Sequence, residues 1–154
     1  MLQRIQSIYL LLIVILSGIN FYSPIATLSA ESIDYIVSYK GIYSLSAAEG
    51  QIFQSAVWGI TVFASLIPII ALITVFLFKK RKLQIRLTYV NIGCILMYYA
   101  SVLAYLYTAV ERYGADWSLK YNVILHAVNL ILCFLAISAI KKDEALVRSH
   151  ERLR

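Results

Sequence analysis

Charged side chains are scarce in this sequence, and four long stretches contain none. Only 14% of the 154 residues are Asp, Glu, Lys or Arg, whereas 61% are hydrophobic. A soluble domain of this length cannot bury so much apolar surface. The composition therefore predicts that the chain resides in a bilayer, whose core takes about 20 apolar residues per spanning helix.

The four uncharged stretches predict an all-α integral membrane protein, a bundle of four transmembrane helices. The predicted spans cover residues 5–22, 52–78, 87–110 and 121–140, an outer loop covers 23–51 and a cytoplasmic tail covers 141–154, all within one membrane domain of residues 1–154. The first span begins just after Arg4. It is interpreted as a retained signal anchor, because Leu28 occupies a position where a cleavage site needs a small residue.

Motifs of enzymes and of ion-coupled transporters are missing. The sequence has no glycine-rich phosphate loop, no closely spaced histidine pair and no serine framed as a nucleophile. Its two cysteines, Cys94 and Cys133, form no C-x-x-C redox motif. No carboxylate or lysine lies inside a predicted span to mark an ion or proton path. We therefore expect neither enzymatic activity nor a bound cofactor or metal.

Lysine and arginine are distributed unevenly about the predicted spans. Eleven of the 14 lie near the termini or between the second and third spans, and only Lys40, Arg112 and Lys120 lie in the other connections. Because cytoplasmic loops carry an excess of these residues, we expect both termini on the cytoplasmic side. The residues assigned to setting this topology are Lys79, Lys80, Arg81, Lys82 and Arg86. Basic residues beside a membrane explain the net charge of +6. We therefore expect no nucleic-acid partner.

Mildly polar residues recur at helical spacing in the third and fourth predicted spans. His126 and Asn129 are three positions apart and Cys133 follows four further on, so they share one face of a helix. Such stripes on facing helices adhere through hydrogen bonds. We predict a helix-packing polar seam of Asn91, Cys94, Tyr98, His126, Asn129 and Cys133. The alternative for His126 is a metal-ligand, haem-ligand or proton-relay role.

Tyrosines recur in the long loop between the first two spans. Residues 33–39 read Ile-Asp-Tyr-Ile-Val-Ser-Tyr, and Lys40-Gly41 leads into a second short run, which is typical of a β-hairpin. Two short strands are marginal alone in water, so this hairpin must lie against the helix ends, the bilayer or a partner. The partner-binding candidates here are Tyr35, Tyr39 and Tyr43. The other interpretation is a loop that rests on the bilayer surface through its tyrosines.

The two ends of the chain carry its most particular patterns. Residues 1–12 read Met-Leu-Gln-Arg-Ile-Gln-Ser-Ile-Tyr-Leu-Leu-Leu, and residues 140–154 contain Leu-Val-Arg-Ser and end in Arg-Leu-Arg. Through these ends and the long first loop, the chain resembles DUF4293, a bacterial family of four-helix membrane proteins. The resemblance implies this architecture and an inner-membrane location, and it implies no particular activity.

These observations predict a non-enzymatic accessory or scaffold subunit of a larger inner-membrane protein assembly. The partner-binding candidates in the tail are Leu146, Val147, Arg148, Arg152 and Arg154. Their apolar and basic side chains suit either a partner protein or anionic headgroups. The expected partners are thus the lipid bilayer and at least one membrane protein. The alternative function is a small-molecule or lipid binder or transporter that uses the polar seam between the third and fourth helices.

Overall fold

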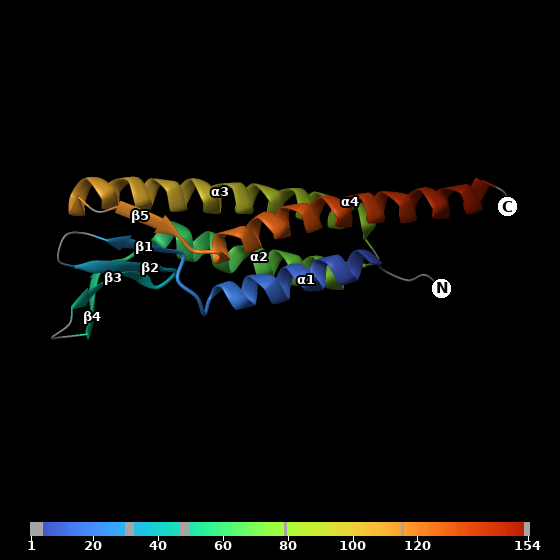
Figure 1. The fold of residues 1–154 in the computed structure, drawn as a ribbon. Helices are drawn as coiled ribbons and strands as arrows, with labels where there is room; N and C mark the ends of the chain where they lie inside the picture. The colour runs from blue at the N-terminus through green and yellow to red at the C-terminus, as the bar shows by residue number, and fades with distance from the viewer. Residues whose placement is uncertain (1–4, 30–32, 47–49, 79, 115, 153–154) are drawn as a thin grey trace.

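The computed structural model describes residues 5–29, 33–46, 50–78, 80–114 and 116–152. Its helices are α1 (Ile5–Asn20), α2 (Trp58–Phe76), α3 (Arg81–Tyr113) and α4 (Asn122–Arg152). Its strands are β1 (Ala26–Ser29), β2 (Asp34–Ser38), β3 (Gly41–Ser46), β4 (Gly50–Ser55) and β5 (Asp116–Leu119). The helices lie side by side, and the strands gather at one end of them (Figure 1).

The prediction of an all-α fold is wrong, because the strands form one five-stranded antiparallel sheet in the order β4-β3-β2-β1-β5. The hairpin expected around Lys40 lies inside this larger sheet as β2 and β3. The pattern also did not indicate the pairing between β1 and the edge strand β5, where Ala26 is opposite Leu119. Each of these strands has four residues, which is too short to show a period of two, and their pairing joins distant parts of the chain.

Three helices are long and apolar enough to cross a membrane, which indicates a membrane protein but contradicts the predicted bundle of four spans. They are α2 with 19 residues, α3 with 33, and residues 122–145 of α4. The helix α1 has 16 residues, fewer than the roughly 20 that a bilayer requires. It ends at Asn20 because the chain turns there, where the N–H of Phe21 donates to the carbonyl of Gly18.

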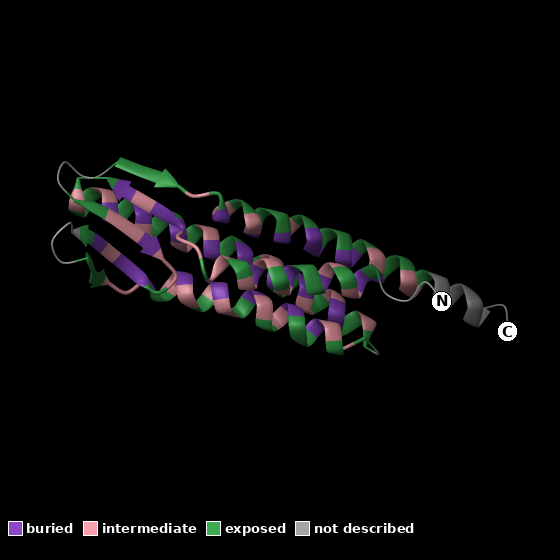
Figure 2. Cartoon of the chain, turned by 60° about the horizontal axis from the view of Figure 1, so that its bottom comes forward, coloured by how far each residue is buried: buried purple, intermediate pink, exposed green. Residues whose placement is uncertain are grey.

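Buried positions recur at steps of three or four residues along the helices. In α3 they are Gln84, Thr88, Asn91, Ile95, Tyr98, Val102, Leu106 and Ala109. This spacing keeps them on one stripe and suits packing at a shallow crossing angle. The stripes meet because α1 and α3 each pack on both α2 and α4. Many large apolar residues are exposed, and exposed positions recur along the helices (Figure 2), as expected of helices solvated by lipid.

One face of the sheet is covered by the far end of α3. The strand register puts Ala26, Leu28 and Val37 on this face, and all three side chains are buried. Tyr35 shares the face and stacks on Tyr113 in the last turn of α3, with ring centroids 4.4 Å apart. The length of α3 therefore serves two purposes, because its first part packs in the helix bundle and its last turns hold the sheet (Figure 1).

Gly59 allows a close approach between α2 and α3. A Cβ atom at this position would lie 3.2 Å from the Ser101 hydroxyl oxygen and 3.3 Å from the Tyr105 ring. We expect Gly59→Leu to push the helices apart and to lower the free energy of unfolding by about 1–3 kcal/mol. Thermal unfolding in detergent measures the loss. Gly18→Leu is the matched control, because nothing lies within 4 Å of a Cβ at Gly18, and equal loss in both variants would contradict the close packing.

Candidate functional site

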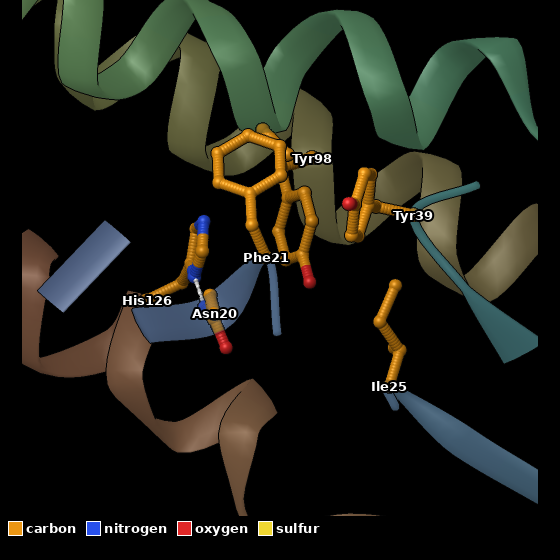
Figure 3. Close-up of a pocket in the computed structure, with 7 residues that line it drawn as sticks. Asn20, Phe21, Ile25, Tyr39, Tyr98 and His126 are labelled. Atoms are coloured by element: carbon orange, nitrogen blue, oxygen red, sulfur yellow. Dashed lines mark hydrogen bonds between the residues drawn. The ribbon is translucent and has the colours of Figure 1, made fainter. Parts of the chain in front are cut away.

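The bundle interior nearest the sheet is built around His126 of α4. Its ring stacks on Tyr98 of α3, with centroids 4.2 Å apart and planes inclined by 16°. The side-chain amide of Asn20, at the end of α1, donates a hydrogen bond to its Nδ1 atom (Figure 3). Because Nδ1 accepts this bond, the neutral imidazole carries its proton on Nε2. Three helices thus meet at one buried side chain.

A second level of polar contacts lies further along the bundle, away from the sheet. The side-chain amide of Asn129 donates to the Ser17 hydroxyl over 3.0 Å and joins α4 to α1. The amide nitrogen of Asn91 lies 3.9 Å from the Cys133 sulfur and joins α3 to α4. All four side chains are buried. Hydrogen bonds inside the apolar segments therefore link the same three helices again.

The third level joins α3 to α2 at the end far from the sheet. The amide nitrogen of Gln84 donates to the backbone carbonyl of Thr74 over 2.9 Å. The Thr88 hydroxyl in turn donates to the Gln84 carbonyl over 2.8 Å. Gln6 of α1 is also buried. Polar side chains consequently occur at several depths of the interior, and they involve every helix.

Five of the six predicted seam residues lie in this interior. Asn91, Tyr98, His126, Asn129 and Cys133 are buried, whereas Cys94 is half-buried. The sequence interpretation confined the seam to the third and fourth spans, but the structure gives His126 and Asn129 their partners on α1.

The contribution of α1 was hidden because an isolated polar residue in an apolar run gives little signal. Gln6 and Asn20 are nonetheless 14 positions apart, which is two heptads and therefore the same face of a helix packed at a period of 3.5 residues. Ser17 lies within the same stripe of buried residues. This spacing is the signal that identifies the third member of the polar interior.

Six buried side-chain atoms have no hydrogen-bond partner among the described residues. They are the amide oxygens of Gln6, Gln84, Asn91, Asn122 and Asn129, and the Nε2 atom of His126. An unpaired polar atom in an apolar environment costs free energy. The interior therefore carries more hydrogen-bonding capacity than the contacts between the helices use.

A small cavity lies beside His126. Its volume is about 10 Å³, and it is lined by Asn20, Phe21, Ile25, Tyr39, Ala64, Tyr98 and His126 (Figure 3). Such a volume holds roughly one water molecule, whereas organic ligands occupy pockets of about 300 Å³ or more. Within the described part of the chain, no group of three or more His, Cys, Asp or Glu side chains could hold a metal ion.

The residues predicted to set the topology lie at the end of the bundle away from the sheet. Arg81 forms an ion pair with Asp143 of α4 over 3.1 Å, and its guanidinium also donates to the Asp143 carbonyl over 3.0 Å. Lys80, Lys82 and Arg86 are exposed, and Lys79 lies outside the described residues. Arg81 thus ties the start of α3 to α4. The sequence did not indicate this contact, because the two residues are 62 positions apart.

The three loop tyrosines predicted to bind a partner lie in different surroundings. Tyr35 stacks on the end of α3, and Tyr39 contacts the Phe21 ring edge-on at 4.8 Å. Tyr43 lies on the opposite face of the sheet, 5.7 Å from the Phe53 ring. Of the three, only Tyr43 therefore faces away from the helices.

The predicted tail is helical as far as Arg152, because α4 continues without a break beyond its apolar segment. Leu146, Val147, Arg148 and Arg152 belong to this helix, while Arg154 lies outside the described residues. The end of α4 reaches beyond the start of α1 (Figure 1). The tail is therefore a helical continuation of α4 along most of its length.

Comparison with known proteins assigns the chain to a family whose function is unknown. A family model described as "Domain of unknown function (DUF4293)" matches residues 2–153. No curated protein matches the chain. The similarity visible at the two ends of the sequence therefore extends through the helices and the sheet between them.

The hydrogen bond between Asn20 and His126 is expected to stabilise the contact between α1 and α4. We expect Asn20→Leu and His126→Phe each to destabilise the protein, and the double variant to lose less than the sum of the two. The coupling free energy should lie between about 0.6 and 1.7 kcal/mol, as for interhelical hydrogen bonds in other membrane proteins. Unfolding of the four proteins in mixed micelles measures it.

A control cycle pairs Asn20→Leu with Ser138→Ala. Ser138 is exposed and its hydroxyl donates only to the Phe134 carbonyl of its own helix, so this cycle should show no coupling. A coupling of zero in the first cycle as well would mean that the Asn20 and His126 side chains do not stabilise each other.

Proposed function

We propose that this chain, which belongs to the DUF4293 family, is a non-enzymatic accessory or scaffold subunit of a larger protein assembly in the bacterial inner membrane. The observation that carries the proposal is the five-stranded sheet at one end of an apolar helix bundle. The sheet offers a face and an edge that the described part of the chain leaves uncovered. Such a layout is suited to hold a binding surface at a constant height above a membrane.

We place the sheet on the outer side of this membrane and the opposite end of the bundle in the cytoplasm. Exposed Tyr22, Trp58 and Tyr121 mark the sheet end, and such aromatic residues favour the membrane interface. The 19 residues of α2 span about 28 Å at 1.5 Å per residue, which matches a hydrocarbon core of about 30 Å. Lys80, Lys82 and Arg86, which are exposed at the opposite end of the bundle, then lie on the cytoplasmic side, where an excess of basic residues is expected.

Both termini are proposed to be cytoplasmic in this multi-pass arrangement, in which α1, although shorter than a usual span, also runs between the two ends of the bundle (Figure 1). The described part of α1 begins, and α4 ends, at the basic end of the bundle (Figure 1). The short helix α1 packs against α2 and α4, and its Ser17 and Asn20 side chains hydrogen-bond to α4. The position of the two helix ends therefore supports the topology that the distribution of cations indicates.

The surface of the sheet turned away from α3 is the proposed docking surface. The register places Ile36, Tyr43 and Phe53 in one row on this face, and Phe53 is 55% exposed. The edge strand β4 is exposed at residues 50–54 and contains neither a charged residue nor a proline. Proteins usually protect an exposed strand edge with charged residues or prolines, and β4 has neither. An extended segment of a partner can therefore pair with β4 and add a strand to the sheet.

A small-molecule or lipid binder or transporter is the second candidate function. The unpaired amide oxygens favour it, because a hydrated or liganded interior would satisfy them. The cavity volume of about 10 Å³ beside His126 counts against it. We therefore favour the interpretation in which the polar interior holds the helices together.

Cys133 distinguishes the two functions, because it is fully buried beside Asn91. A closed interior predicts that a small water-soluble thiol reagent leaves Cys133 unmodified in the native protein and modifies it after denaturation. Mass spectrometry of a Cys94→Ser variant, in which Cys133 is the remaining thiol, measures both rates. Rapid modification of the native protein would indicate a hydrated cavity and favour the binder or transporter.

The scaffold function predicts a stoichiometric companion protein after purification in gentle detergent. We expect Tyr43→Ser combined with Phe53→Ser to release the companion, because these two side chains contact each other on the face turned away from α3, at the edge strand β4. The matched control is Leu103→Ser combined with Tyr107→Ser, two exposed positions on α3. Deletion of residues 145–154 tests whether the tail contributes to the contact. A strictly monomeric protein without any companion would refute the scaffold function.

A further inference from the structure

The outward face of α3 carries a stripe of residues whose chemistry changes with depth. Exposed positions follow one another at Lys82, Arg86, Tyr89, Gly93 and Leu96. Steps of three and four residues keep them on one side of the helix. From the basic end inward, the stripe presents two cations, an aromatic hydroxyl, a gap and an aliphatic side chain. A phospholipid presents matching groups in the same order, from its phosphate through its ester groups to its acyl chains.

The two cations of this stripe are free of ion pairs within the described part of the chain. Neither Lys82 nor Arg86 forms an ion pair with a described residue, and the Asp143 carboxylate at this end pairs with Arg81. Arg86 lies four residues, about 6 Å, closer to the apolar segment than Lys82. Leu83 and Val90 beside it are exposed. A guanidinium on a lipid-facing surface extends toward the headgroups and needs an anion there.

Gly93 leaves the surface of α3 open next to these cations. No heavy atom lies within 4 Å of the position that a Cβ would occupy. Tyr89, one turn before it, and Met97, one turn after it, are both about half exposed, at 50% and 52%. An acyl chain can therefore lie directly on the helix backbone between two protruding side chains.

From this arrangement we infer that Lys82, Arg86, Tyr89 and Gly93 form a binding site for one anionic phospholipid in the leaflet at the basic end of the bundle. The Arg86 guanidinium binds the phosphate through paired hydrogen bonds, and Lys82 adds charge. The Tyr89 hydroxyl lies at the level of the ester groups, and the acyl chain occupies the gap at Gly93. This site stands whether or not the sheet binds a partner protein.

Native mass spectrometry of the full chain in detergent tests the site with two lipids, phosphatidylglycerol and phosphatidylcholine. We expect the first to be retained more tightly. The Lys82→Gln/Arg86→Gln double variant should lose about tenfold or more of its affinity for phosphatidylglycerol, since each cation near a headgroup contributes on the order of 1 kcal/mol. Arg86→Lys, which keeps the charge, should retain part of that affinity.

The matched control is Lys141→Gln/Lys142→Gln, which removes the same charge from exposed positions of α4 at the same end. It should change the affinity little. Gly93→Leu should weaken binding without altering its salt dependence, because it fills the gap and removes no charge. Equal losses in both charge variants, equal retention of the two lipids, or unchanged binding by Gly93→Leu would each overturn the site. Release of a protein companion in place of lipid would also overturn it, by identifying this face as a protein contact.

Discussion

Inside a bilayer no water is present to satisfy a backbone N–H or C=O group, so each must be paired within the protein. This constraint divides the molecule in two. The segments that are apolar enough to cross the membrane are helices. In a helix, the backbone N–H and C=O groups are paired with one another inside the same segment. The sheet, whose edge strands β4 and β5 have unpaired outer sides in the described chain, lies beyond the helix bundle. There water or a partner can satisfy those edges.

The same constraint explains the distribution of polarity within the bundle. The outward faces carry aliphatic and aromatic side chains, whereas Asn, Gln and His side chains lie between the helices. Association of such helices cannot rely on a hydrophobic driving force, because lipid is as apolar as the side chains themselves. Hydrogen bonds such as Asn129 to Ser17 and Asn20 to His126, together with close packing at Gly59, supply the attraction. At the basic end of the bundle, the ion pair between Arg81 and Asp143 holds α3 to α4.

The helix α3 couples the two halves. At 33 residues it is about 50 Å long, which exceeds the bilayer core by several turns. Those turns carry Ala109 and Tyr113, which pack on the inner face of the sheet. The sheet is thereby fixed to the bundle by a continuous helix in addition to its loops. A binding surface on the sheet would keep a defined orientation for the same reason.

The amino-acid sequence by itself determined that the chain forms apolar helices suited to a lipid bilayer. Unbroken apolar runs, a basic connection and polar residues at helical spacing follow from the local order of residues, so the presence of three long apolar helices and the buried polar face of His126 and Asn129 were predictable. The start of the second predicted span was not, because residues 52–55 lie in β4. Only the tertiary structure decided the sheet and the full polar interior. The strands β1 and β5 have four residues each and pair across most of the chain, and the partners of Asn20 and Ser17 lie 106 and 112 positions away on α4. Such contacts depend on which distant segments meet, and no local period records that.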